Sequence, residues 1–125
     1  MNIEALKALL DLINDTKQSE PPVYKKSNPM IGKECIVRTY SAGVYFGTLE
    51  TLDGMQATIS NARRMWQWRT VEGIELNALA KHGIDQSGSR IAEASPLVLV
   101  TECVEVIPCS TKSAKSISEA KNAIK

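Results

Sequence analysis

Two spacings of apolar residues alternate along this chain of 125 residues, and each spacing predicts a different kind of element. Residues 1–17 place apolar side chains three and four positions apart, with charged residues between them, which predicts an amphipathic helix. Residues 18–30 contain three prolines and no periodic pattern, so we expect a linker or an extended arm. The apolar stripe of the predicted helix has to be buried, either against the rest of the domain or against a partner. It consists of Ile3, Leu6, Leu9, Leu10 and Ile13.

Residues 31–109 form the predicted core domain, which opens with three strand patterns. Alternating apolar residues predict strands over 34–40 and 44–52, and an Asp-Gly dipeptide predicts a tight hairpin turn after them. A third, long strand is expected over 55–69. Gly47 within the second strand predicts a bulge or a sharp bend. Three strands joined in this way make a strongly curled antiparallel meander.

The spacing becomes helical after the third strand. Residues 74–82 carry apolar side chains at helical intervals and are followed by a glycine, which predicts a short inserted helix. Residues 96–108 are the most apolar stretch, and their β-branched content predicts a central strand. Residues 110–125 are rich in Ser, Lys and Ala, which predicts a flexible or weakly helical tail. The fold class is therefore mainly β, a β-rich α+β domain built as a small curled barrel with two helices attached.

Composition and charge narrow the kind of protein. A chain with 43% hydrophobic and 23% charged residues is typical of one soluble globular domain. The net charge of +1 disfavours a protein whose main task is to grip long nucleic acid. Residues 31–70 carry five cations against three acids, whereas residues 71–109 carry two cations against six acids. Such an uneven distribution suits local binding of an anion or pairing with a second copy of the chain.

Catalytic and metal chemistry find little support in the sequence. The three cysteines have no CxxC spacing and no signal peptide accompanies them, which is typical of reduced thiols in a cytoplasm. The single histidine, His82, has no neighbours at metal-ligand spacing, and no serine or cysteine has a recognisable histidine partner. No phosphate-loop or dinucleotide-fold motif is present, and no apolar run is long enough to span a membrane. We therefore expect a binding protein with no catalytic residues, metal or cofactor.

Two resemblances add to this interpretation. The strand, the hairpin containing "FGTLETLDG" and the third strand passing into "NAR" resemble the Sm-like and SH3-like small β-barrels. In those barrels the meander closes on itself and edge strands often pair between subunits. The resemblance therefore implies a small SH3/Sm-like barrel and a homo-oligomer.

The second resemblance covers most of residues 31–109. The blocks "CIVRTYSAGVYFGTL", "NARRMWQW", "GIELNALAKHGI" and "EVIPCS", in that order, resemble a family of short uncharacterised bacteriophage and prophage proteins. This implies a virus-encoded accessory protein that acts in the cytoplasm of a bacterial host. Small phage proteins of this kind often counter host defences, some of them by sequestering nucleotide signals.

The strongest candidate for binding chemistry is the cluster of arginines and tryptophans at 63–68, on the strand that is expected to bend near Asn61. Strand alternation puts Arg64, Trp66 and Trp68 on one face and Arg63 on the other. The rings could stack on a nucleobase, while arginine offers a two-pronged donor for phosphate. Neighbouring aromatic and polar residues could complete the site. The candidate ligand-binding residues are Arg63, Arg64, Trp66, Trp68, Tyr45, Asn61, Ser41 and Tyr40.

The same residues also allow a purely structural interpretation. Trp66 and Trp68 could fill the core, because tryptophan buries a large apolar area and usually serves packing. The arginines could then lie in solvent or over a ring, and an arginine that points inward is expected to need an anion there.

The functional hypothesis is a phage-encoded anti-defence protein that sequesters a nucleotide-derived host immune signal without cleaving it. A single-stranded nucleic-acid-binding barrel is an alternative that the modest charge disfavours. A second alternative is a protein that inhibits a host defence enzyme.

Overall fold

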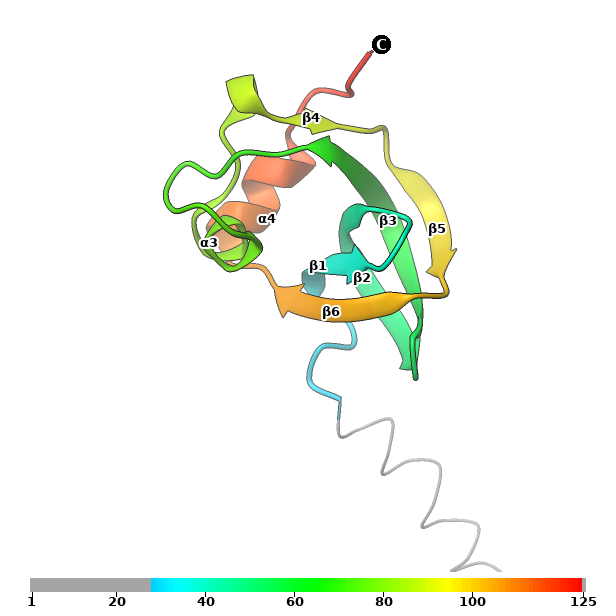
Figure 1. Cartoon of the computed structure of the whole chain (residues 1–125). Coiled ribbons are helices and arrows are strands. Elements are labelled where there is room, and N and C mark those ends of the chain that lie inside the picture. Colours follow the sequence, from blue (N-terminus) through cyan, green and yellow to red (C-terminus); the bar gives the residue numbers. More distant parts are fainter. Residues whose placement is uncertain (1–27, 125) are drawn as a thin grey trace, which may run out of the picture.

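The computed structural model describes residues 28–124, and the described chain is mainly β, as the sequence predicts. The helix predicted over residues 1–17 and most of the linker predicted over 18–30 lie outside the described residues. Two helices, a 3-10 turn and six strands follow one another along the chain (Figure 1). They are β1 (Glu34–Thr39), β2 (Val44–Asp53), β3 (Gln56–Gln67), α3 (Leu76–His82), η1 (Gln86–Gly88), β4 (Arg90–Ile91), β5 (Ser95–Val100), β6 (Cys103–Pro108) and α4 (Thr111–Ser118).

The strands form one antiparallel sheet in the order β4-β3-β2-β1-β6, and β5 also pairs with β3. The first half of the long strand β3 pairs with β5 and its second half pairs with β4. In Figure 1 the strands curl around the centre of the view, with α3 and α4 together on one side. The predicted curled meander of β1, β2 and β3 is thus confirmed, whereas β5 and β6 lie on opposite edges and leave the sheet open.

A bulge between β2 and β3 decides which side chains face which way. The pairing register shifts between Phe46 and Thr48, and Asn61 opposite them has a left-handed φ of 48°. A Cβ on Gly47 would lie 2.4 Å from Ile59 Cγ2, so only glycine fits. The bulge predicted at Gly47 and the bend predicted near Asn61 are both confirmed.

The sheet separates two hydrophobic clusters. The inner core lies within the curl of the sheet and is built from alternate residues of the strands. The helix-side core lies between the other sheet face and α3 and α4. The inner core contains Cys35, Val37, Tyr45, Leu49, Ala57, Ile59, Ala62, Val100 and Cys103, and the helix-side core contains Ile36, Phe46, Met65, Leu79, Ala80, Ile84, Ile91, Ala114, Ile117 and Ala120. Alternation therefore directs neighbouring residues of one strand into different cores.

The single central strand predicted over 96–108 is wrong. The chain instead forms β5 and β6, separated by a corner at Thr101 and Glu102, and both strands lie at sheet edges. The corner is needed because β5 pairs with β3 on one side of the sheet, whereas β6 pairs with β1 on the other. An unbroken apolar pattern does not reveal this change of partner.

The helical segments follow the apolar spacing. α3 lies within the predicted range 74–82 and ends at Gly83, whose φ is 99°. Within the predicted tail, α4 begins after Ser110, whose side chain caps the helix by accepting a hydrogen bond from the Ser113 amide. α4 buries Ala114 and Ile117 in the helix-side core. Within residues 28–124, no helix is long and apolar enough to cross a bilayer.

Candidate functional site

Arg63 is buried, with 5% of its surface exposed, and it serves the fold. Each of its five N–H groups has an acceptor. Nε donates to Ala92 O at 2.8 Å, Nη1 to Ile117 O at 2.8 Å and Ser118 O at 3.3 Å, and Nη2 to Ile91 O at 3.5 Å and Asn122 Oδ1 at 3.0 Å. Two of these carbonyls lie at the carboxyl end of α4, where the helix dipole is negative. Arg63 therefore ties β3 to β4, α4 and the segment after α4.

This geometry corrects the expectation that an inward-facing arginine needs an anion. Carbonyl oxygens supply the partial negative charge, and burial lowers the pKa of the Arg63 guanidinium below its usual value. A cavity of about 270 Å³ beside Arg63 is also lined by Asn61 and Gly47. Because every donor of the guanidinium is already used, a ligand in this cavity would find no free hydrogen-bond donor on Arg63.

Arg64 lies next to Arg63 in the sequence but on the opposite face of β3. Its guanidinium carbon is 5.0 Å from the centroid of the Tyr45 ring and 5.6 Å from that of the Trp66 ring. Its Nε and Nη2 both donate to the Tyr45 hydroxyl, the former at 3.1 Å. Tyr45 belongs to the inner core, whereas Trp66 is 68% exposed. Arg64 thus fixes an exposed indole ring next to a buried phenol.

Trp68 does not share the face of Trp66, and that prediction is wrong. It is partly buried against the helix-side core, which also contains Met65. The reason is a register shift between Met65 and Gln67 opposite β4, after which β3 ends. The two tryptophans therefore differ: Trp68 packs against the helix-side core, whereas the ring of Trp66 is accessible to a ligand.

A cavity of about 480 Å³ opens beside Trp66, and Gln67, Arg90, Ala123 and Ile124 line the rest of it. β4 brings Arg90 here, where its Nη2 donates to Ile124 O at 3.0 Å. Gln67 Nε2 donates to Gly88 O at 3.3 Å. Arg90 is absent from the predicted site residues, although it is one of only two cations in the acidic stretch 71–109, which was a signal in the sequence.

The other three predicted residues lie elsewhere. Tyr40 and Ser41 are in the turn between β1 and β2, where Tyr40 is 79% exposed and the Ser41 hydroxyl donates to the Glu102 carboxylate. Asn61 occupies the bulge. Within residues 28–124, no hydrogen bond or cation–π contact joins these three to Arg64 or Trp66. The structure therefore assembles Tyr45, Arg64 and Trp66 from the predicted set.

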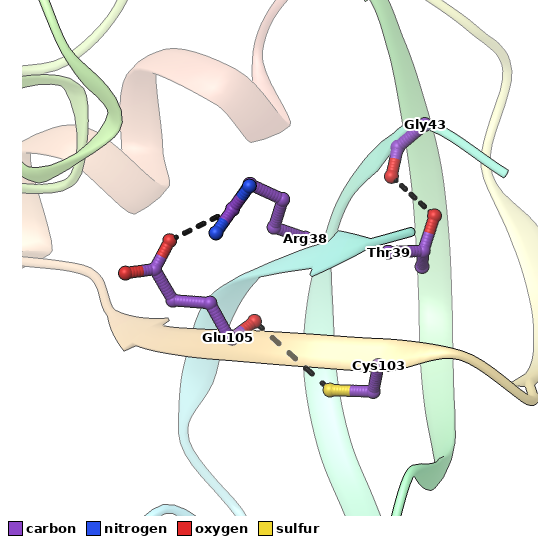
Figure 2. Close-up of polar contacts among 5 residues, drawn as sticks. All are labelled: Arg38, Thr39, Gly43, Cys103 and Glu105. Atoms are coloured by element: carbon purple, nitrogen blue, oxygen red, sulfur yellow. Dashed lines mark hydrogen bonds and ion pairs between the residues drawn. The ribbon is translucent and has the colours of Figure 1, made fainter. Parts of the chain in front are cut away.

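Polar groups at the edge formed by β1 and β6 form hydrogen bonds and an ion pair with neighbouring groups of the same edge. Figure 2 shows Arg38 Nε 3.0 Å from Glu105 Oε1, and the Thr39 hydroxyl donating to Gly43 O at 2.7 Å. The Cys103 thiol lies 4.0 Å from Glu105 O. These contacts hold a strand pair and the adjoining turn.

The cysteines show no sign of metal or redox chemistry. Burial raises the pKa of Cys35 to about 11 and that of Cys109 to about 12, so both stay protonated near neutral pH. In the part of the chain that the structure describes, no group of three or more His, Cys, Asp or Glu side chains could hold a metal ion.

The fold and the site define a small, mainly β domain that presents an arginine-supported tryptophan beside an open cavity. A family model described as a domain of unknown function (DUF6948) matches residues 32–117, and the chain belongs to this family. Comparisons with curated proteins and with solved structures find no match.

Proposed function

We propose that this protein binds a small nucleotide at the Trp66 cavity and retains it without cleaving it. The observation that carries the proposal is the 68% exposed ring of Trp66, which Arg64 supports and which borders a cavity of about 480 Å³. Cavities of this size are typical of sites for small molecules. A large aromatic ring is costly to leave in water, so its exposure beside a cavity favours a ligand that covers it.

The ring and its neighbours match the parts of a nucleotide. A base can stack on the face of the indole that Arg64 does not cover, and such stacking contributes about 1–3 kcal/mol. Gln67 carries an amide that can read a polar base edge. Arg90 uses one described hydrogen bond, to Ile124 O, and retains donors for a phosphate.

Charge favours a small ligand over a long strand. A protein that tracks a nucleic-acid backbone needs several cations in a row, whereas this cavity is lined by one, Arg90, with Arg64 behind the ring. The net charge of +1 points the same way. Together with the sequence resemblance to phage proteins, this supports sequestration of a nucleotide-derived defence signal in the host cytoplasm.

The test is a thermal-shift screen of the full chain against mononucleotides, linear and cyclic dinucleotides, ADP-ribose and short single-stranded oligonucleotides. A ligand that binds only the folded state, present at a hundred times its Kd, stabilises the protein by about 2.7 kcal/mol. Calorimetry on each hit then compares wild type with Trp66→Ala, which should weaken binding by about 5- to 150-fold. Tyr40→Ala is the matched control, since Tyr40 is an exposed ring outside the cavity.

The outcomes separate the hypotheses. Tight binding of a small nucleotide that Trp66→Ala weakens by about 5- to 150-fold and Tyr40→Ala preserves would support the proposal. Hits confined to oligonucleotides, with affinity that falls steeply as salt rises, would replace it with a strand binder. A well-folded protein with no hit would point to a host protein as partner.

A further inference from the structure

We infer that the ligand is a dinucleotide whose two nucleosides occupy adjoining cavities, with Arg90 at the phosphate between them; this rests on the proposed function. A second cavity, of about 690 Å³, shares Arg90 and Ala123 with the Trp66 cavity. Each volume alone falls in the range typical of small-molecule sites. A mononucleotide on Trp66 would leave the larger cavity empty, whereas a two-part ligand would use both.

Arg90 stands where the two cavities meet. Its guanidinium has five donors, and within residues 28–124 only Nη2 has a hydrogen-bond acceptor, Ile124 O at 3.0 Å. A planar guanidinium suits a phosphodiester, because two parallel N–H groups can meet two phosphate oxygens. The position of Arg90 therefore matches the linking phosphate of a dinucleotide better than a terminal phosphate at one end.

The second cavity has polar and apolar lining residues but no aromatic one, which sets what it can hold. Besides Arg90, the polar lining residues are Gln86, Ser87, Ser89, Glu119, Lys121 and Asn122. The Glu119 carboxylate disfavours a phosphate in this cavity and leaves the sugar and base as the parts that it can hold. Gln86, Ser87 and Ser89 already donate to neighbouring groups of the chain, so they offer mainly acceptor oxygens, whereas Lys121 offers an ammonium donor. Such a set can recognise a sugar or the polar edge of a base by hydrogen bonds. The first nucleoside is thus held by stacking on Trp66 and the second by hydrogen bonds.

The wall between the cavities is fixed before any ligand arrives. Ala123 N donates to Ile91 O at 2.8 Å, and Asn122 accepts a hydrogen bond from Arg63 at 3.0 Å. A parallel bridge also pairs Ile91 with Asn122. The buried guanidinium of Arg63 therefore holds the segment that shapes both cavities, which reduces the ordering that binding would otherwise require.

The experiment compares each nucleoside monophosphate with the 3′→5′ dinucleotide of the same base by calorimetry on the full chain. We expect the dinucleotide to bind at least about tenfold tighter than the mononucleotide, because one additional set of polar contacts is enough to lower the Kd by this factor. Lys121→Ala and the space-filling Ser87→Phe should bring dinucleotide affinity close to that of the mononucleotide and leave mononucleotide affinity unchanged. Lys112→Ala is the control, because this exposed lysine of α4 lines neither cavity.

Failure of the inference and failure of the proposed function look different. Equal affinities for the two ligands, or no effect of Lys121→Ala and Ser87→Phe, would overturn the dinucleotide and leave the nucleotide site on Trp66. If Trp66→Ala binds both ligands like wild type, or if neither ligand binds wild type, the proposed function falls and the inference falls with it.

Discussion

Replacement of Arg63 by alanine should destabilise the domain far more than replacement of its neighbour Arg64. The Arg63 guanidinium joins three parts of the fold through five hydrogen bonds, of which the bond to Ile117 O is short and buried. Hydrogen bonds to a charged group contribute about 1.5–3 kcal/mol each when buried, and the partly exposed carbonyls regain water when the side chain is removed. We therefore expect Arg63→Ala to lower the free energy of unfolding by about 3–5 kcal/mol.

The size of this loss can be compared with the total free energy of unfolding of the domain. A domain of this kind has a free energy of unfolding of about 5–15 kcal/mol, so Arg63→Ala removes a large share and could leave the domain partly unfolded. Arg63→Lys keeps the charge but cannot reach five acceptors, and it should cost about 2 kcal/mol. Arg64→Ala loses two cation–π contacts and the bonds to Tyr45, at a cost of about 1 kcal/mol.

Urea unfolding, followed by tryptophan fluorescence and far-UV circular dichroism, measures all three variants against wild type. A loss below 1 kcal/mol for Arg63→Ala, similar to that for Arg64→Ala, would refute the structural role of Arg63. Ligand binding gives a second, independent readout. Arg64→Ala should lose more affinity than Arg63→Lys, where the latter is folded, because Arg63 acts on the site only through the segment that it holds. The reverse order would assign Arg63 to the ligand.

Three further predictions concern packing, capping and the thiols. Gly47→Ala should lower the free energy of unfolding in urea by about 1–3 kcal/mol, because its Cβ would overlap a neighbouring isoleucine. The control, Glu50→Ala on the same strand, should change it by no more than about 0.5 kcal/mol. Equal effects would contradict the bulge geometry. Ser110→Ala should remove the α4 cap and lower stability by about 0.5–2 kcal/mol, and an unchanged melting temperature would contradict this. Burial raises the folded-state pKa of Cys35 to about 11 and that of Cys109 to about 12, whereas an unfolded thiol has a pKa of about 8.5. The thiols' full contribution to the free energy of unfolding is therefore present below about pH 8.5, and it is lost as the pH rises from there through 11–12. Cys35→Ala should therefore lose less stability than wild type between pH 8 and 10.5, and identical losses would rule the thiol out as a cause.

The features that follow from local pattern were predictable from the sequence. Strand alternation and the Asp-Gly turn predict the meander, and Gly47 predicts the bulge that shapes it. The short helix α3 follows from apolar spacing and its terminal Gly83. Each of these depends on residues that are close in the sequence.

The features that failed depend on pairing between distant segments. The corner between β5 and β6 exists because the two strands join different edges, which no local signal in residues 96–108 reports. Trp68 turns to the helix-side core because β4 shifts the register of β3 near its end. Arg90 reaches Trp66 through a strand of two residues, which is too short to leave a periodic pattern.

The bulge at Gly47 and Asn61 decides which of two adjacent arginines belongs to the fold and which belongs to the site. Ile59 faces the inner core, and in a regular strand the residues at even spacing from it, including Arg63, would face inward as well. The extra residue at the bulge reverses this order, so Ala62 faces inward and Arg63 turns toward α4. The same reversal puts Arg64 beside Tyr45 and leaves the ring of Trp66 exposed at its cavity. The bulge thereby keeps the charge of Arg63 out of the apolar inner core and places it among carbonyl oxygens on the opposite face. There the guanidinium holds the segment that lines the proposed ligand site.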